Sequence, residues 1–310
     1  MEKLAALVGP TAVGKTGLSL ILAEDMRGEI ISCDSMQVYK GMDIGTAKAG
    51  AFEREIVPHH LIDVVEPDMC FTVADYQKAA VEAIRNISAR GLLPIMVGGT
   101  GLYYQSVVDD FDFFPMESRD AIRHKWEQVY SQMGIDYLYE QVLSVDRDYA
   151  IKIGSKDKKR MIRALEVYEH TGKPFTEFQK RNTNSYNLAA VGLYLEREQL
   201  YARIEERVDK MIKQGLVEEV AKLREKGFDL SLNSMQALGY KQVYYYLEGM
   251  LGWDETLQAI KQETRRFAKR QYTWFNKDKR ISWINVSDYK EMTTLAKKIC
   301  SLMEGQLYGM

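Results

Sequence analysis

The sequence predicts an α/β fold, in which a parallel sheet carries helices on both faces and an all-helical insertion domain interrupts the chain. Two observations favour the sheet: short apolar runs alternate with longer helical stretches, and two of the runs end in glycine-rich turns. A third favours the insertion, because strand patterns stop between 113 and 188 and charge-rich helical patterns replace them. We therefore expect a core domain of residues 1–112 and 189–310 and a helical domain of residues 113–188.

The elements of the core follow in chain order. Before the insertion, the patterns predict strands at 3–8, 29–33 and 92–97 and helices at 15–26 and 73–90. After it, they predict strands at 189–195 and 281–286 and helices at 197–226, 234–248 and 254–275. Parallel strands bring their carboxyl ends to one edge of the sheet, so ligand-binding residues are expected there.

Composition and charge narrow the class of protein. The chain has 310 residues, 46% hydrophobic and 28% charged, which indicates a folded protein. The first apolar run ends at Gly9, short of the ~18 residues of a membrane span, and the three cysteines are far apart, so we expect a cytoplasmic protein without membrane contact or disulfides. We also expect a monomer. Residues 1–150 hold 13 Lys and Arg against 23 Asp and Glu, whereas residues 151–310 hold 29 against 21. A basic second half fits nucleic-acid binding, although solvated helix faces explain it equally well.

A phosphate-binding loop is the strongest motif in the chain. Residues 9–16 fit G-x-x-x-x-G-K-[ST] at every fixed position, between a predicted strand and a predicted helix. Backbone N–H groups of such a loop surround phosphate oxygens, the lysine adds a cation and the threonine hydroxyl reaches Mg²⁺. The motif predicts a P-loop NTPase-like core that binds a di- or triphosphate through Gly9, Pro10, Thr11, Ala12, Val13, Gly14, Lys15 and Thr16.

Two further turns at the same sheet edge carry candidate catalytic groups. Asp34 follows the second strand and could accept a proton from a nucleophile, with Ser35 and Gln37 orienting the acceptor. In isolation an Asp-Ser pair is more often a helix cap, but its place beside a phosphate loop favours catalysis. Thr100 offers a hydroxyl from the glycine turn after the third strand.

Several basic stretches and the histidines are less specific. Arg203 and Arg207 lie one helical turn apart and could bind a diphosphate, although Glu205 and Glu206 offer ordinary pairing. In the helix 261–270 we expect Phe267, with Trp274 beyond it, to pack in the core. His59 and His60 fall in a predicted loop without metal-ligand spacing, so any metal is expected to be Mg²⁺ held mainly by substrate phosphates.

Taken together, the motifs resemble those of bacterial tRNA dimethylallyltransferases, also called tRNA isopentenyltransferases. The resemblance rests on GPTAVGKT at 9–16, ISCDSMQVYKGMDIGTAK at 31–48, PHHLID at 58–63, VGGTGLY at 97–103, RALEVY at 163–168 followed by TGKP, RIEERVDKM at 203–211 and LGYKQ at 238–242. It implies transfer of a dimethylallyl group from dimethylallyl diphosphate to N6 of the adenosine 3′ to the anticodon (position 37) of tRNA, with release of diphosphate.

The resemblance also implies roles for individual residues. It places the general base at Asp34, a catalytic hydroxyl at Thr100 and the diphosphate arginine at Arg207, with Mg²⁺ near Thr16 and Ser35. It implies that the anticodon stem-loop contacts Asp34, Ser35, Met36, Gln37, Thr100, Arg123, Lys158, Lys159, Arg160, Met161, Ile162, Met235, Gln236, Ala237, Leu238, Gly239 and Tyr240.

Two other classes of function compete with this hypothesis. A small-molecule P-loop kinase would use ATP at the same loop and bind an acceptor hydroxyl at Asp34. An RNA-binding protein without activity would leave Lys15, Asp34 and Thr100 with no role.

Overall fold

The computed structural model describes residues 1–113, 120–178 and 181–309. The chain divides into two compact units. One consists of residues 1–108 and 184–310 and the other of residues 109–183, whereas the sequence predicts an insertion of residues 113–188.

The larger unit is built on a six-stranded sheet with the order β3-β2-β4-β1-β5-β6, in which every pairing is parallel. Its strands are β1 (Glu2–Val8), β2 (Gly28–Cys33), β3 (His59–His60), β4 (Leu93–Gly98), β5 (Tyr186–Tyr194) and β6 (Ile281–Asn285). The predicted fold class is confirmed. The expected loop at His59-His60 is wrong, because these two residues pair with Ile30 and Ile31 as a short edge strand. A two-residue strand is too short for a sequence pattern to reveal.

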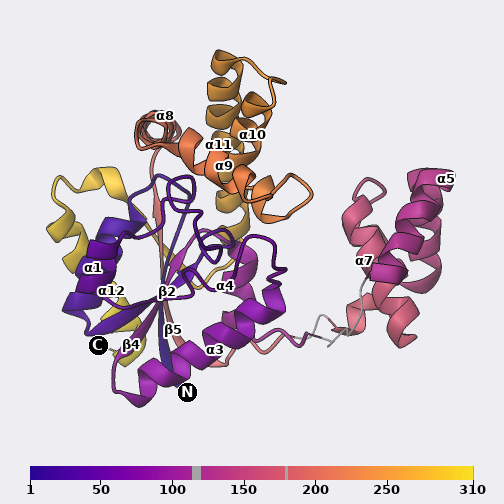
Figure 1. Ribbon diagram of the computed structural model, residues 1–310. Helices are drawn as coiled ribbons and strands as arrows, with labels where there is room; N and C mark the ends of the chain where they lie inside the picture. The colour runs from indigo at the N-terminus through magenta and orange to yellow at the C-terminus, as the bar shows by residue number, and fades with distance from the viewer. Residues whose placement is uncertain (114–119, 179–180, 310) are drawn as a thin grey trace. The chain divides into compact units, whose positions relative to one another are not determined.

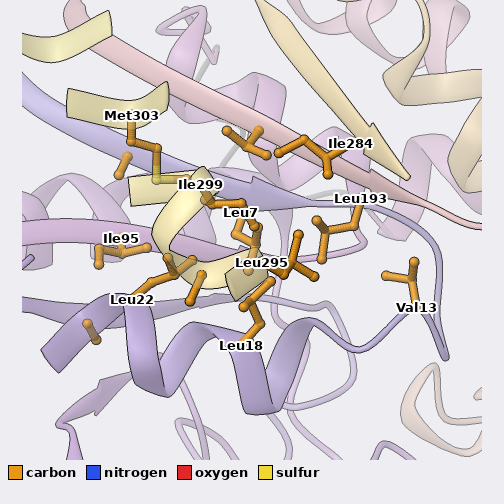
Figure 2. Close-up of a cluster of buried hydrophobic side chains, with 14 of the residues drawn as sticks. Leu7, Val13, Leu18, Leu22, Ile95, Leu193, Ile284, Leu295, Ile299 and Met303 are labelled. Carbon is orange, nitrogen blue, oxygen red and sulfur yellow. The ribbon is translucent and has the colours of Figure 1, made fainter. Parts of the chain in front are cut away.

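Helices cover both faces of the sheet (Figure 1). Helices α1 (Lys15–Asp25) and α12 (Met292–Tyr308) pack on one face, and α3 (Val73–Ala89) and α4 (Gly101–Val108) on the other. Figure 2 shows the first of these cores, where Leu18 and Leu22 of α1 meet Leu295 and Ile299 of α12. The spacing of four residues in each pair places both side chains on one helix face. This packing fixes the carboxyl edge of the sheet.

A further group of helices lies beyond the carboxyl ends of the strands (Figure 1). It comprises α8 (Arg197–Lys213), α9 (Leu216–Glu225), α10 (Tyr240–Leu247) and α11 (Trp253–Phe275). The predicted single helix 197–226 is wrong, because Gly215 adopts a φ of 99° and ends α8. The predicted helix 234–248 is likewise a 3₁₀ turn (Ser234–Gln236) followed by α10. This unit also contains the short helix α2 (Ala51–Ile56) and a 3₁₀ turn (Val286–Asp288).

The described part of the smaller unit is mainly helical. It contains α5 (Asp120–Val145), α6 (Arg147–Ile153), α7 (Lys158–Thr171) and a 3₁₀ turn (Phe175–Phe178), with α5 interrupted at Gly134. Its core is formed by apolar side chains of the three helices, among them Leu138, Val142, Ala150, Met161, Ile162 and Leu165. Across the described ranges of both units, every helix is too short or too polar to cross a lipid bilayer.

Candidate active site

The phosphate loop connects β1 to α1 and borders a cavity of about 490 Å³ at the carboxyl edge of the sheet. Ala12 (φ 64°) and Gly14 (φ 105°) both adopt left-handed backbone conformations, which curl the loop toward the amino end of α1. Of the predicted phosphate-binding residues, Thr11, Ala12, Gly14, Lys15 and Thr16 line the cavity. The other residues of the motif do not line the cavity; they are Gly9, Pro10 and Val13. Val13 is fully buried in the core.

Lys15 is held inside the loop that carries it. Its Nζ donates hydrogen bonds to the carbonyl oxygens of Gly9 (2.9 Å) and Pro10 (2.7 Å). Burial of the amino group, assisted by the positive charge of Arg207, lowers the pKa of Lys15 to about 7, while the carboxylate of Asp34 acts in the opposite direction. The enclosed lysine and the nearby arginine make this cavity suited to an anion.

Helix α8 supplies the other cations of the cavity. Arg203, Arg207 and Lys210 line it from successive turns of the helix. Burial lowers the pKa of Arg207, and Asp34 partly restores it. Arg203 lies near the loop, with Nη1 3.4 Å from the carbonyl oxygen of Val13. Glu205, which the sequence offered as a partner for Arg203 and Arg207, pairs instead with Arg265 at 2.9 Å.

Asp34 stands at the junction of two cavities. Its Oδ1 accepts the backbone N–H of Met36 (2.9 Å), which fixes the turn after β2. Among the described residues, none donates a hydrogen bond to its other oxygen, Oδ2. Asp34 lines both cavities, so its carboxylate borders the space that a group bound in either of them would occupy.

The second cavity, of about 270 Å³, adjoins the first and is richer in apolar side chains. Val208, Met211 and Ile260 contribute to its wall, together with residues 236–239. Both cavities are lined by Thr11, Asp34, Thr46, Arg207 and Phe267. A cationic cavity and a more apolar one therefore share a carboxylate and an arginine.

Thr100 and Ser35 occupy different positions from those expected. Thr100 lines neither cavity. Its Oγ1 accepts the backbone N–H of Ser35 (3.0 Å) and lies 3.4 Å from the Ser35 hydroxyl, so it fixes the residue next to Asp34. Ser35 lines the second cavity, whereas Thr16 lines the first. The two residues whose hydroxyls are expected near Mg²⁺ thus line different cavities.

No cluster of three or more His, Cys, Asp or Glu side chains suited to a metal occurs within residues 1–113, 120–178 and 181–309. The exposed residue Thr16 lines the first cavity and carries the hydroxyl that the motif offers to a cation.

The remaining residues predicted to contact tRNA fall into two groups. In the larger unit, Met36, Gln236, Ala237, Leu238 and Gly239 line the second cavity and Gln37 lines the first. Met235 and Tyr240 are buried, and the Tyr240 hydroxyl donates to Glu219. These two side chains support the cavity wall from within.

The second group lies in the helical unit. Lys159 and Arg160 are exposed at the start of α7, and the Lys158 Nζ lies 4.2 Å from the centre of the Tyr130 ring. Met161 and Ile162 are buried in the core of this unit, so their packing presents the preceding basic residues to solvent. Arg123 contacts the buried Glu166 through Nε at 2.6 Å.

Helix α11 differs from expectation. Phe267 lines both cavities instead of packing in the core, because it lies on the face of α11 turned toward the phosphate loop. Trp274 is half-buried and packs against Gly101. The same helix contributes Gln271 to the first cavity, a residue that the sequence analysis missed because an isolated glutamine in a basic helix carries no motif.

Residues 37–278 match the profile of the IPP transferase family. Over 99% of both chains, the protein is 61% identical to the tRNA dimethylallyltransferase of Syntrophomonas wolfei. It is similar to the solved full-length tRNA isopentenylpyrophosphate transferase of Bacillus halodurans, with a TM-score of 0.73, 41% identity and coverage of 99% of this chain and 98% of that one. It is also similar to the structure of a eukaryotic dimethylallyltransferase acting on tRNA, with a TM-score of 0.80, 29% identity and coverage of 96% and 77%.

Proposed function

The chain belongs to the IPP transferase family, and we propose on that premise that it transfers a dimethylallyl group from dimethylallyl diphosphate to tRNA, at N6 of the adenosine 3′ to the anticodon. One observation carries the proposal: a cationic cavity and a more apolar cavity meet at Asp34 and Arg207. A reaction between a diphosphate ester and a nucleobase requires two such compartments with one shared reaction point.

The first cavity would bind the diphosphate. Backbone N–H groups at the amino end of α1 and the cations of Lys15 and Arg207 are oriented toward the same space. As the bond between the dimethylallyl carbon and the diphosphate oxygen breaks, negative charge grows on that oxygen, and cations placed in advance stabilise it. The Thr16 hydroxyl and the diphosphate oxygens would hold Mg²⁺, which would neutralise further charge.

Asp34 would accept the proton of the attacking amine. The lone pair of an adenine N6 is delocalised into the ring, so N6 is a poor nucleophile until a base removes its proton. The Oδ2 atom of Asp34 would act as the base, which is supported by the bond of Oδ1 to Met36 and by the position of the carboxylate at both cavities. Thr100 would contribute by fixing Ser35, and with it the orientation of Asp34.

The second cavity would receive the target base. An adenine stacked within an anticodon loop cannot reach Asp34. It would therefore leave the stack and enter the second cavity, beside residues 236–239 of its wall. The exposed basic residues Lys159 and Arg160 would contact phosphates of the same tRNA.

Incubation of the protein with labelled dimethylallyl diphosphate, Mg²⁺ and unmodified tRNA, without ATP, tests the proposal. We expect label in tRNA and release of diphosphate. A tRNA with guanosine in place of adenosine at position 37 should accept no label, and Asp34→Asn should bind tRNA but transfer little. ATP-dependent phosphorylation of an acceptor, or label on another nucleotide, would contradict the proposal.

A further inference from the structure

The side chain of Gln271 connects two loops that come from different strands. Its Oε1 accepts the backbone N–H of Thr11 in the phosphate loop (2.8 Å), and its Nε2 donates to the carbonyl oxygen of Gly99 in the turn after β4 (3.0 Å). Thr11 borders both cavities, and Gly99 precedes Thr100, which fixes Ser35 beside Asp34. One amide therefore joins the diphosphate side of the site to its acceptor side.

The packing around this amide is close. Gln271 is 5% exposed, and a Cβ atom built on Gly99 would lie 2.1 Å from the Gln271 Nε2. Only a residue without a side chain at position 99 lets the glutamine approach the turn. A buried amide with one donor and one acceptor bond defines the separation of its two partners more tightly than an apolar contact would, because leaving either partner unpaired is costly.

Helix α11 is itself anchored near Gln271. The Tyr272 hydroxyl accepts the backbone N–H of Leu195 (3.0 Å), which ties the helix to the end of β5. One turn further, Trp274 packs directly against Gly101. The helix therefore holds Gln271 in a fixed position, and the two hydrogen bonds of its amide hold both loops relative to the helix.

We propose that Gln271 is a positioning residue for the transfer reaction, which sets the distance between the phosphate loop and the turn that holds Asp34. It acts through hydrogen bonds to the two loops. The inference rests on the proposed function, because it concerns the alignment of diphosphate and acceptor. Misplacement of reacting groups by about 1 Å can reduce a rate on the order of 100-fold.

Two substitutions separate positioning from packing. Gln271→Met keeps the length and the neutrality of the side chain but removes both hydrogen bonds. Gln271→Glu restores them only when protonated, because a carboxylic acid accepts with its carbonyl oxygen and donates with its hydroxyl, whereas an ionised carboxylate cannot donate to Gly99. Gln77→Leu is the matched control, since the Gln77 Nε2 likewise donates to a backbone oxygen, that of Ser106 (2.8 Å), but Gln77 lines neither cavity.

The measurement is kcat at saturating dimethylallyl diphosphate and tRNA, together with thermal unfolding and tRNA affinity. We expect Gln271→Met to lose at least about tenfold in kcat with tRNA affinity unchanged, and Gln77→Leu to keep the wild-type kcat even where its melting temperature falls. The kcat of Gln271→Glu relative to wild type should rise as the pH falls from about 8 to about 6, whereas the ratio for Gln271→Met should stay flat.

Two results would overturn the inference: Gln271→Met with a wild-type kcat, or a Gln271→Glu ratio that does not change with pH. Failure of the proposed function is distinguishable from both, because in that case the wild-type protein itself would transfer no label.

Discussion

Proton uptake by Lys15 on diphosphate binding is a quantitative consequence of the site. The pKa of Lys15 is lowered to about 7 in the ligand-free protein, and a bound diphosphate would raise it again by supplying negative charge. With a pKa of about 7, binding should take up about 0.5 proton at pH 7 and about 0.9 proton at pH 8. The deprotonated fraction of free Lys15 grows with pH, so binding of the diphosphate must be accompanied by the uptake of more protons at higher pH. The affinity for the diphosphate should therefore weaken by up to about tenfold per pH unit above 7.

Isothermal titration of dimethylallyl diphosphate in buffers of different ionisation enthalpy measures this uptake. Protonation of the ligand itself contributes equally to wild type and Lys15→Met, so the difference between them reports Lys15. Lys210→Met is the control, because Lys210 lines the same cavity but its side chain is exposed. Equal uptake by wild type and Lys15→Met at pH 8 would refute the reasoning, since it would mean that Lys15 is already charged before the ligand binds.

Three further outcomes are expected. Asp34→Asn should lower kcat by about 10²- to 10⁴-fold while tRNA affinity falls much less, because a general base acts in the transition state; a variant with more than about a tenth of wild-type turnover would exclude that role. Glu219→Ala should lower the free energy of unfolding in denaturant titration by about 1–3 kcal/mol, because the carboxylate accepts backbone N–H groups of residues 43–45; an unchanged midpoint would contradict this. Lys159→Ala should reduce the slope of log affinity for tRNA against log salt by about 0.7–0.9, whereas Arg266→Ala, which removes a residue paired with Glu263, should not; an unchanged slope for Lys159→Ala would make the start of α7 a solvated face.

The parts of the site that could be predicted are those encoded in consecutive residues. The phosphate loop can be found in the sequence because its glycines, its lysine and its hydroxyl residue must follow one another at a fixed spacing. Asp34 was found in the same way, from its place directly after a strand of a parallel sheet. The role of Thr100 could not be read so well, because whether its hydroxyl faces a cavity or a backbone N–H depends on how β2 and β4 pair.

The contribution of α11 was beyond the sequence analysis for a physical reason. Basic residues with interleaved aromatics predict an amphipathic helix, but not what its apolar face covers. The structure places Phe267 at both cavities and joins Gln271 to Thr11, which is 260 residues away in the chain. Such a contact depends on where the helix packs.

The parallel α/β core, the phosphate loop, the carboxylate beside it and the resemblance to one family can all be predicted from the sequence, because each depends on local pattern and short-range spacing. The tertiary structure alone decided that two cavities share Asp34 and Arg207, and that Gln271 spans the two loops. Packing of α8 and α11 over the carboxyl edge of the sheet creates those relations, and no stretch of consecutive residues contains them.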